Sequence, residues 1–209
     1  MVSRYLRPNR KNFLTMIRYF GLLLLPLFLA INPQLRGTTV IAPDFDQLVT
    51  RAELIFQGEV TDVRSQWIGE GAEHRIVSFV TFKVADALKG NPGASYTIRM
   101  LGGTVGGETL QVSDTPTFKI GDRDILFVEN NGSQFIPLVG IHHGRFRVER
   151  DEAGREVVMT GERQPLADVE QLGKDEATIT IGRAAMSVND FKAAIQTKLR
   201  QAQVNTRPH

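Results

Sequence analysis

Two adjacent histidines, His142 and His143, are the residues of this sequence best suited to metal chemistry. In a strand, neighbouring side chains point to opposite faces, so the pair could not bind one ion; in a loop both imidazoles could reach it. The spacings H-E-x-x-H and H-x-H, which present histidines together, do not occur. A metal-dependent hydrolase that uses His142 and His143 with nearby acids is therefore the alternative hypothesis, and we predict no metal and no cofactor.

Other candidate catalytic groups are weaker. Asp122 and Asp124 are two residues apart and share a face if extended, but they flank Arg123 just before an apolar run, which predicts solvated charges in a turn. A serine nucleophile needs a strand-to-helix elbow, whereas Ser133 follows Gly132 in a sequence typical of a hairpin. We predict no catalytic residues, and an enzyme is the less favoured class.

The glycine-rich stretch Met100–Val112, MLGGTVGGETLQV, resembles a phosphate loop only superficially. A phosphate loop requires a lysine and a hydroxyl after its last glycine, but Glu108 follows Gly107. The flanking residues are typical of strands, and no helix follows to bind an anion. The stretch is predicted to be a turn between strands in which glycine supplies unusual backbone angles.

The N-terminus indicates export. Residues 1–37 contain six arginines and lysines and no acid, and the apolar run from Gly21 to Ile31 is shorter than the roughly 20 residues of a membrane-spanning helix. We predict a signal peptide over 1–37, cleaved after Gly37, and a periplasmic or secreted protein. An inner-membrane protein anchored through residues 13–31 is the alternative.

Removal of this segment changes the charge. Of the 25 basic residues, 19 remain against 23 acidic residues, so the exported part has a formal charge of −4, although the whole chain is +2. This balance argues against nucleic-acid binding. The chain has no cysteine, so its core must hold it together without disulfides. The expected partner is a protein or another envelope component.

The exported part is predicted to be mainly β. Alternating apolar residues predict strands in 54–67, 75–88 and 95–101, with a bulge or bend at Gly58. Further strands are expected in 108–112 and 145–160, and a hairpin in 121–140 with its turn at Asn130–Gly132. Trp67 is expected in the core. This pattern predicts a small antiparallel barrel.

Two helices are expected at the ends of this domain. Asp44 and Gln47 form a capping-box pattern that begins a short N-terminal helix. Ser187 caps a C-terminal amphipathic helix over about 187–202, whose apolar stripe is expected to dock on the barrel. The predicted organisation is a signal peptide (1–37), a barrel domain (38–160) and a C-terminal extension (161–209).

A family resemblance supports this fold. The segments TTVIAPDFDQLVTRAELIFQGEVTDVRSQW, VSFVTFKVADALKG, PTFKIGDRDILFVE and LVGIHHGRFRV resemble a family of uncharacterised bacterial exported proteins over Thr38 to Val148, and MSVNDFKAAI resembles its closing helix. The resemblance implies an OB-like barrel, similar to that of the tissue inhibitors of metalloproteinases. Those inhibitors use an N-terminal cysteine, which this chain lacks, so protease inhibition is not implied. The expected function is non-enzymatic binding or interaction at the cell envelope.

Overall fold

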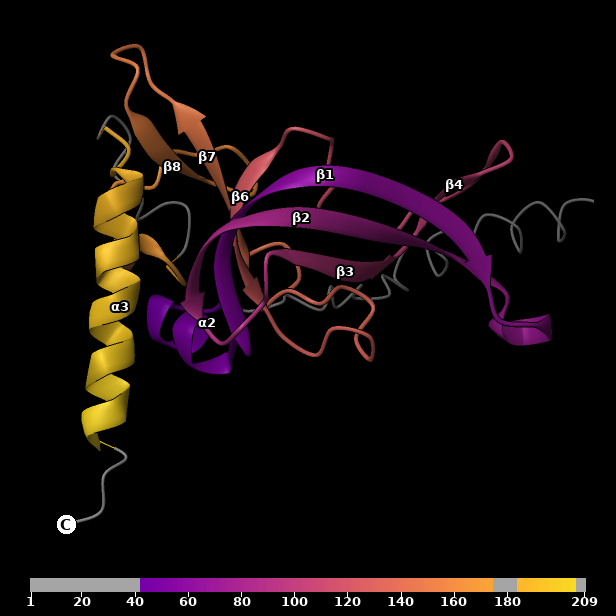
Figure 1. The fold of residues 1–209 in the computed structure, drawn as a ribbon, viewed down its shortest axis with the longest axis horizontal. Helices are drawn as coiled ribbons and strands as arrows, with labels where there is room; N and C mark the ends of the chain where they lie inside the picture. The colour runs from indigo at the N-terminus through magenta and orange to yellow at the C-terminus, as the bar shows by residue number, and fades with distance from the viewer. Residues whose placement is uncertain (1–41, 175–183, 206–209) are drawn as a thin grey trace, which may run out of the picture. The chain divides into compact units, whose positions relative to one another are not determined.

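Two long strands, each rich in β-branched and aromatic residues, form the centre of the fold (Figure 1). This computed structural model describes residues 42–174 and 184–205; the expected signal peptide and residues 13–31 lie outside the described residues. Strand β1 (Leu54–Ile68) and strand β2 (Arg75–Lys89) pair antiparallel from Ile55↔Lys89 to Ile68↔Arg75, and the 3₁₀ turn η1 (Gly71–Glu73) joins them. The strands predicted there are confirmed.

The bend expected at Gly58 is present. The register of β1 against β2 shifts between Gln57 and Gly58 and again between Val60 and Asp62. A Cβ at Gly58 would lie only 3.0 Å from the carbonyl oxygen of Lys83, so the close approach of the strands requires glycine. These shifts let β1 and β2 curve over the rest of the sheet.

The main sheet has six antiparallel strands in the order β3-β2-β1-β6-β7-β8. Its remaining members are β3 (Ser95–Leu101), β6 (Arg123–Val128), β7 (Arg145–Arg150) and β8 (Glu156–Thr160). A separate hairpin pairs β4 (Gly103–Val105) with β5 (Glu108–Leu110). The prediction of a mainly β, antiparallel fold is confirmed. A closed barrel was also expected, but no ladder joins β3 to β8 within residues 42–174 and 184–205.

A loop, and not a strand, covers the outer edge of β3. The amide of Arg99 donates to Asn131 Oδ1 (3.0 Å), the Asn131 side chain donates to the carbonyl of Thr97 (2.9 Å), and the amide of Leu101 donates to the carbonyl of Phe135 (2.8 Å). The prediction of a second strand in the 121–140 hairpin is wrong, because only one bridge, Val128↔Leu138, forms between its two halves. Phe135 instead bonds the edge of β3, while Pro137 and Val139 bond to Glu129 and Phe127 at the end of β6.

Strand β6 is buried on both faces, and so it separates two cores. Ile125 and Phe127 face the helices, in a core with residues of β7, β8, α2 and α3. Leu126 and Val128 face the concave side of β1–β3, where the second core consists of Phe56, Val60, Val80, Phe82, Ile98, Met100, Phe118, Leu126, Val128, Ile136 and Leu138. A strand buried on both faces has a continuous apolar run, as in RDILFV.

Both expected helices are confirmed. Helix α2 (Phe45–Arg51) has the capping box, because the Gln47 amide donates to Asp44 Oδ1 (2.7 Å) and the Asp44 amide donates to Gln47 Oε1 (3.1 Å). Helix α3 (Val188–Asn205) begins after Ser187, and its stripe of Val188, Phe191 and Ile195 is buried in the first core. No helix in the described part of the chain is long and apolar enough to span a bilayer.

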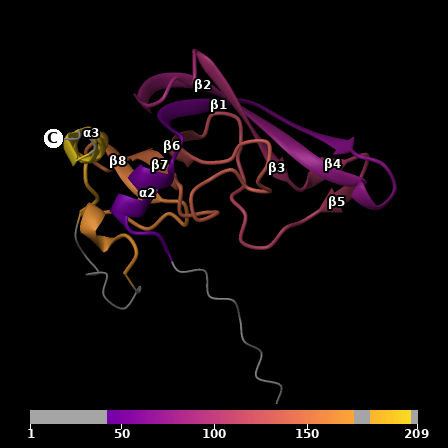
Figure 2. The same ribbon diagram turned by 90° about the horizontal axis from the view of Figure 1, so that it is seen from below.

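Helix α3 and the β4–β5 hairpin lie toward opposite ends of β1 and β2 in both views (Figures 1 and 2). Trp67 was expected in the core, but it lies near the end of the β1–β2 pair. It is 37% exposed and stacks on His74 with ring centroids 4.3 Å apart. The concave side of the sheet and the β4–β5 hairpin therefore form surfaces distinct from the helix-packed side.

Candidate functional site

The glycine-rich stretch forms the β4–β5 hairpin, so the predicted turn is present but is limited to Gly106 and Gly107, and Gly103–Val105 is a strand. Gly106 and Gly107 occupy its two-residue turn with φ of 58° and 89°. Positive φ at both central residues is the geometry that hairpin turns favour and that glycine adopts readily.

The preceding glycine pair permits close contact between the hairpin and the long strands. Gly103 has φ of 135°, and a Cβ there would lie 2.3 Å from the hydroxyl oxygen of Ser65 and 2.4 Å from that of Ser78. The Ser78 hydroxyl donates to the carbonyl of Gly102 (2.7 Å), and the two serine hydroxyls are 2.9 Å apart. These hydrogen bonds fix the hairpin above β1 and β2.

A groove of about 450 Å³ lies between this hairpin, the segment 111–118 and the concave side of β1–β3. Its walls are apolar, hydroxyl-bearing or glycine residues, with one amide, and none of these described lining residues is ionisable. They are Val63, Ser65, Ser78, Val80, Met100, Leu101, Gly102, Gly103, Thr104, Thr109, Leu110, Gln111, Val112, Thr115, Pro116, Thr117 and Phe118. We call this surface the hairpin groove.

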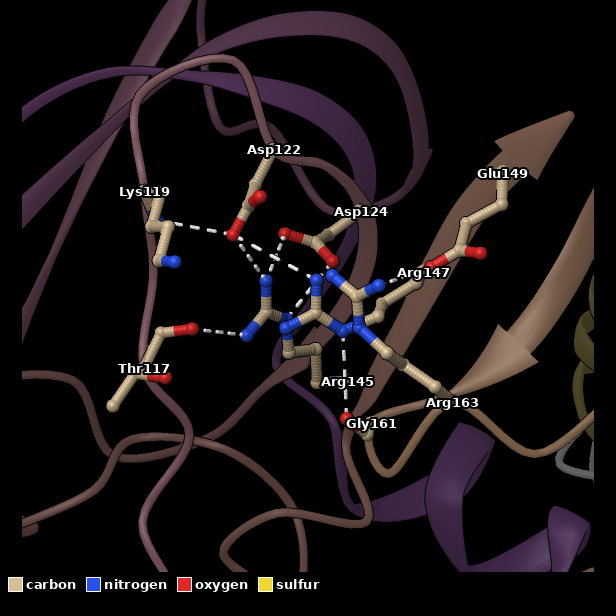
Figure 3. Close-up of polar contacts among 9 residues, drawn as sticks. All are labelled: Thr117, Lys119, Asp122, Asp124, Arg145, Arg147, Glu149, Gly161 and Arg163. Atoms are coloured by element: carbon tan, nitrogen blue, oxygen red, sulfur yellow. Dashed lines mark hydrogen bonds and ion pairs between the residues drawn. The ribbon is translucent and has the colours of Figure 1, made fainter.

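A buried ion-pair network lies beside the hairpin groove (Figure 3). The guanidinium of Arg145, only 1% exposed, donates twice to the carboxylate of Asp124, from Nε (2.9 Å) and Nη2 (3.0 Å). Nη2 also donates to Asp122 Oδ2 (2.8 Å), and Nη1 donates to the carbonyl of Thr117 (2.6 Å). The guanidinium lies 4.0 Å above the ring of Phe118. Arg145 thereby ties β7, β6 and the segment before β6 together.

The expectation that Asp122 and Asp124 are solvated is wrong. Asp124 is 0% exposed and Asp122 is 19% exposed at its side chain. Burial raises the pKa of Asp122, but the hydrogen bonds from the Lys119 amide and the Arg145 guanidinium outweigh burial and leave that pKa below its usual value. Burial instead raises the pKa of Asp124, and the hydrogen bonds and charge of Arg145 only partly offset this effect. Both carboxylates are bound by Arg145 and so do not form a free acid–base pair.

The two histidines lie in a turn, where both rings turn to the same side. The ring centroids of His142 and His143 are 3.9 Å apart, and His142 Nε2 is 3.5 Å from Glu162 Oε1. Burial, with a smaller contribution from the neighbouring His142, lowers the pKa of His143. Within the described residues, no group of three or more His, Asp or Glu side chains is arranged to hold a metal ion.

A second, smaller cavity of about 220 Å³ connects the histidine turn to the ion-pair network. Arg145, Arg147 and His142 line it, together with the segment 114–117 and, from the segment after β8, Gly161 and Glu162. Thr115, Pro116 and Thr117 line both this cavity and the hairpin groove, so the two are neighbours. We call it the arginine pocket.

Sequence reasoning named the histidines and the acids but missed Arg145 and Arg147. An arginine in an alternating strand normally faces solvent, and nothing local reveals that these two face inward. The available signal was the spacing: two acids at i and i+2 flank the first residue of one strand, and two arginines at i and i+2 lie at the start of the next. Antiparallel pairing of β6 with β7 brings the four together, with Asp124 opposite Arg147.

Comparison with protein-family models, with curated proteins and with solved structures finds no match to this chain. The resemblance to exported OB-like proteins therefore stays a prediction, and the function must be argued from the geometry.

Proposed function

We propose that this chain is an exported, non-enzymatic domain that binds a short uncharged segment of a partner protein at the cell envelope, and that the hairpin groove is its binding surface. The observation that carries the proposal is the composition of the groove: it offers apolar contacts and hydrogen-bonding hydroxyls, and no ionisable side chain among its described lining residues. General acid–base catalysis needs a titratable group within reach of the substrate, whereas recognition of an uncharged chain does not.

The fixed geometry of the groove also favours binding. The Ser65, Ser78 and Gly102 hydrogen bonds hold the hairpin in place, so little entropy is lost when a ligand enters. The floor of the groove is the second core, in which Phe82 and Phe118 pack edge to face at 5.5 Å. A rigid floor with a fixed wall favours a preformed site.

We also propose that β1, β2, β3 and β6 form an OB-like barrel that is incompletely closed. The loop after β6 bonds to the outer edge of β3 at three points, which supports closure by a loop where a strand is missing. Export is proposed from the basic segment and apolar run within 1–37, with the anchored form as the alternative. N-terminal sequencing of the protein from the producing cells tests export: a start at Thr38 or nearby supports a cleaved signal, and a start near Met1 supports the anchor.

Binding in the hairpin groove is tested with a defined probe. A blocked hexapeptide of alternating threonine and valine, titrated into the isotope-labelled chain, should cause saturable NMR shifts at Thr104, Leu110 and Val112. Leu110→Glu places a charge in the groove wall and should weaken binding about tenfold or more, because burying an unpaired charge is unfavourable. Val204→Glu, the same change at an exposed position of α3, should leave binding unchanged.

Two results would contradict the groove proposal. One is the absence of saturable shifts at the groove with this peptide and with the same peptide carrying isoleucine in place of valine. The other is equal weakening by Leu110→Glu and Val204→Glu.

The metal-dependent hydrolase retains one favourable observation: the two imidazoles lie against each other, and His142 Nε2 is 3.5 Å from Glu162 Oε1. Two histidines and one carboxylate could supply the ligands of a hydrolytic zinc if the turn rearranged. Stoichiometric zinc or manganese in the purified chain, lost on His142→Ala, would favour this alternative over the binding proposal.

A further inference from the structure

Arg147 is a largely buried cation that lacks a carboxylate of its own. Its side chain is 13% exposed, and to the residues that the structure describes it donates one hydrogen bond, from Nε to the carbonyl of Gly161 at 3.4 Å. The nearest carboxylate oxygen, Asp122 Oδ2, is 3.8 Å from Nη1. Buried charges in proteins are normally paired and hydrogen-bonded, so this guanidinium has donors to spare.

The two nearby carboxylates are already engaged by Arg145. Both oxygens of Asp124 accept from Arg145, and Asp122 Oδ2 accepts from Arg145 and from the Lys119 amide. Arg163, the next cation, is 3.7 Å from Glu149 and points to that residue instead (Figure 3). Within this network, Arg147 is therefore the cation whose charge is least compensated.

A cavity lies next to the unused N–H donors of Arg147. Arg147 lines the arginine pocket, whose volume of about 220 Å³ is enough for a small group of heavy atoms. On the same pocket stands His142, whose Nδ1 is buried and has no hydrogen-bond partner among the described residues. A polar nitrogen buried without a partner is rare in native proteins, so His142 has hydrogen-bonding capacity that the described residues do not use.

We propose that the arginine pocket binds a small oxyanion, a carboxylate or a phosphate group, through Arg147 and His142. A guanidinium presents parallel N–H donors that match two oxygens of such a group, and an imidazole Nδ1–H supplies one more donor. Arg145 does not bind the anion directly: its hydrogen bonds to Asp122 and Asp124 hold the pocket wall and occupy the oxygens of these acids that could otherwise accept from Arg147.

Glu162 and Asp114 limit the affinity and do not abolish the site. Both are at the lining of the pocket, and the Glu162 side chain is 60% exposed, so solvent screens its repulsion of an anion. Arg147 is only 13% exposed, and an opposite charge has a stronger effect on a buried group than on an exposed one. The site is consequently expected to bind a lone ion weakly.

This inference is independent of the groove proposal and is tested by itself. The labelled full chain is titrated with acetate and, separately, with inorganic phosphate at constant ionic strength, with chloride as the reference anion. The readouts are the Arg147 Nε–H and the His142 Cε1–H resonances. We expect saturable shifts with at least one oxyanion and not with chloride. Tighter binding of acetate would indicate a carboxylate ligand, and tighter binding of phosphate would indicate a phosphate group.

Three variants make the test decisive. Arg147→Gln should weaken binding at least about tenfold, whereas Arg163→Gln, the same loss of a guanidinium outside the pocket, should leave binding unchanged. Glu162→Gln removes a screened like charge and should tighten binding about two- to threefold; it lies at an exposed position, so it reports even if Arg147→Gln fails to fold.

Saturable shifts with neither oxyanion would overturn the proposal. So would unchanged or weaker binding in Glu162→Gln, or binding by folded Arg147→Gln as tight as that of Arg163→Gln. Because the peptide titration reads the hairpin groove and this titration reads the arginine pocket, failure of one leaves the other standing.

Discussion

Arg145 is predicted to be the residue on which stability depends most, and Arg145→Met tests this. The side chain is 1% exposed and donates four hydrogen bonds, two of them to Asp124, which is 0% exposed. Methionine fills a similar space but leaves the Asp124 charge buried without a partner. Breaking a buried ion pair in this way costs about 3–5 kcal/mol, which in a chain of this size lowers Tm by about 6–20 °C.

The magnitude is tested by a double-mutant cycle. Urea denaturation followed by circular dichroism gives the free energy of unfolding for Arg145→Met, for Asp124→Leu and for the two combined. Since the double variant no longer buries Asp124 without its partner, it should be more stable than Arg145→Met by at least about 1 kcal/mol. Arg64→Met, at a pair whose arginine is 77% exposed, is the control and should change stability by no more than about 0.5 kcal/mol.

The reasoning would be refuted by two outcomes. One is a loss below about 1 kcal/mol in Arg145→Met, which would mean that the network contributes little. The other is a double variant whose loss equals the sum of the single losses, which would mean that Arg145 and Asp124 do not interact.

Three further predictions concern the glycines and the histidines. Gly103→Ala should destabilise the fold by about 2–4 kcal/mol, because the added Cβ displaces the Ser65 hydroxyl and breaks the hydrogen bond of that hydroxyl. The Cβ of Gly107→Ala meets open space, so this variant should lose only about 1–2 kcal/mol, for the unfavourable backbone angle. Equal losses in the free energy of unfolding would contradict the close contact at Gly103. Burial lowers the pKa of His143 in the folded chain, so stability should be full above about pH 7 and should fall as the pH drops through about 6.5. His143→Gln should flatten this decline in melting experiments between pH 7.5 and 5.5. An unchanged dependence of Tm on pH would argue against the burial of a neutral His143. Mass-spectrometric metal analysis of the purified chain should find no stoichiometric zinc or manganese, and a metal lost on His142→Ala would contradict this.

The strands were predictable because their residues alternate over long runs. β3 has the predicted limits, and β1 and β2 extend one residue further, since β-branched and aromatic side chains repeat at period two. The capping box of α2 was predictable for a similar reason: it involves residues three apart. Patterns that depend on near neighbours in the sequence are readable there.

Features that depend on distant residues were not predictable. The strand expected after Gly132 is reduced to one bridge, and Phe135 and the turn residue Asn131 bond instead to β3, about thirty residues earlier in the chain. The burial of Arg145 depends on β6 lying beside β7, and the common orientation of the histidine rings depends on a turn in which Ile141 has a φ of 66°. The sequence of each segment alone contains none of this.

Site-specific photo-crosslinking in the producing cells tests the central claim most directly. A benzophenone amino acid is placed at Thr104, in the wall of the hairpin groove, and in parallel at Val204, which is exposed on α3. We predict one discrete protein adduct from Thr104, suppressed by Leu110→Glu and absent from Val204, with the crosslinked partner residue in an uncharged stretch. Identical adducts from both positions, or an adduct at Thr104 that Leu110→Glu leaves intact, would contradict the assignment of the groove as a binding surface.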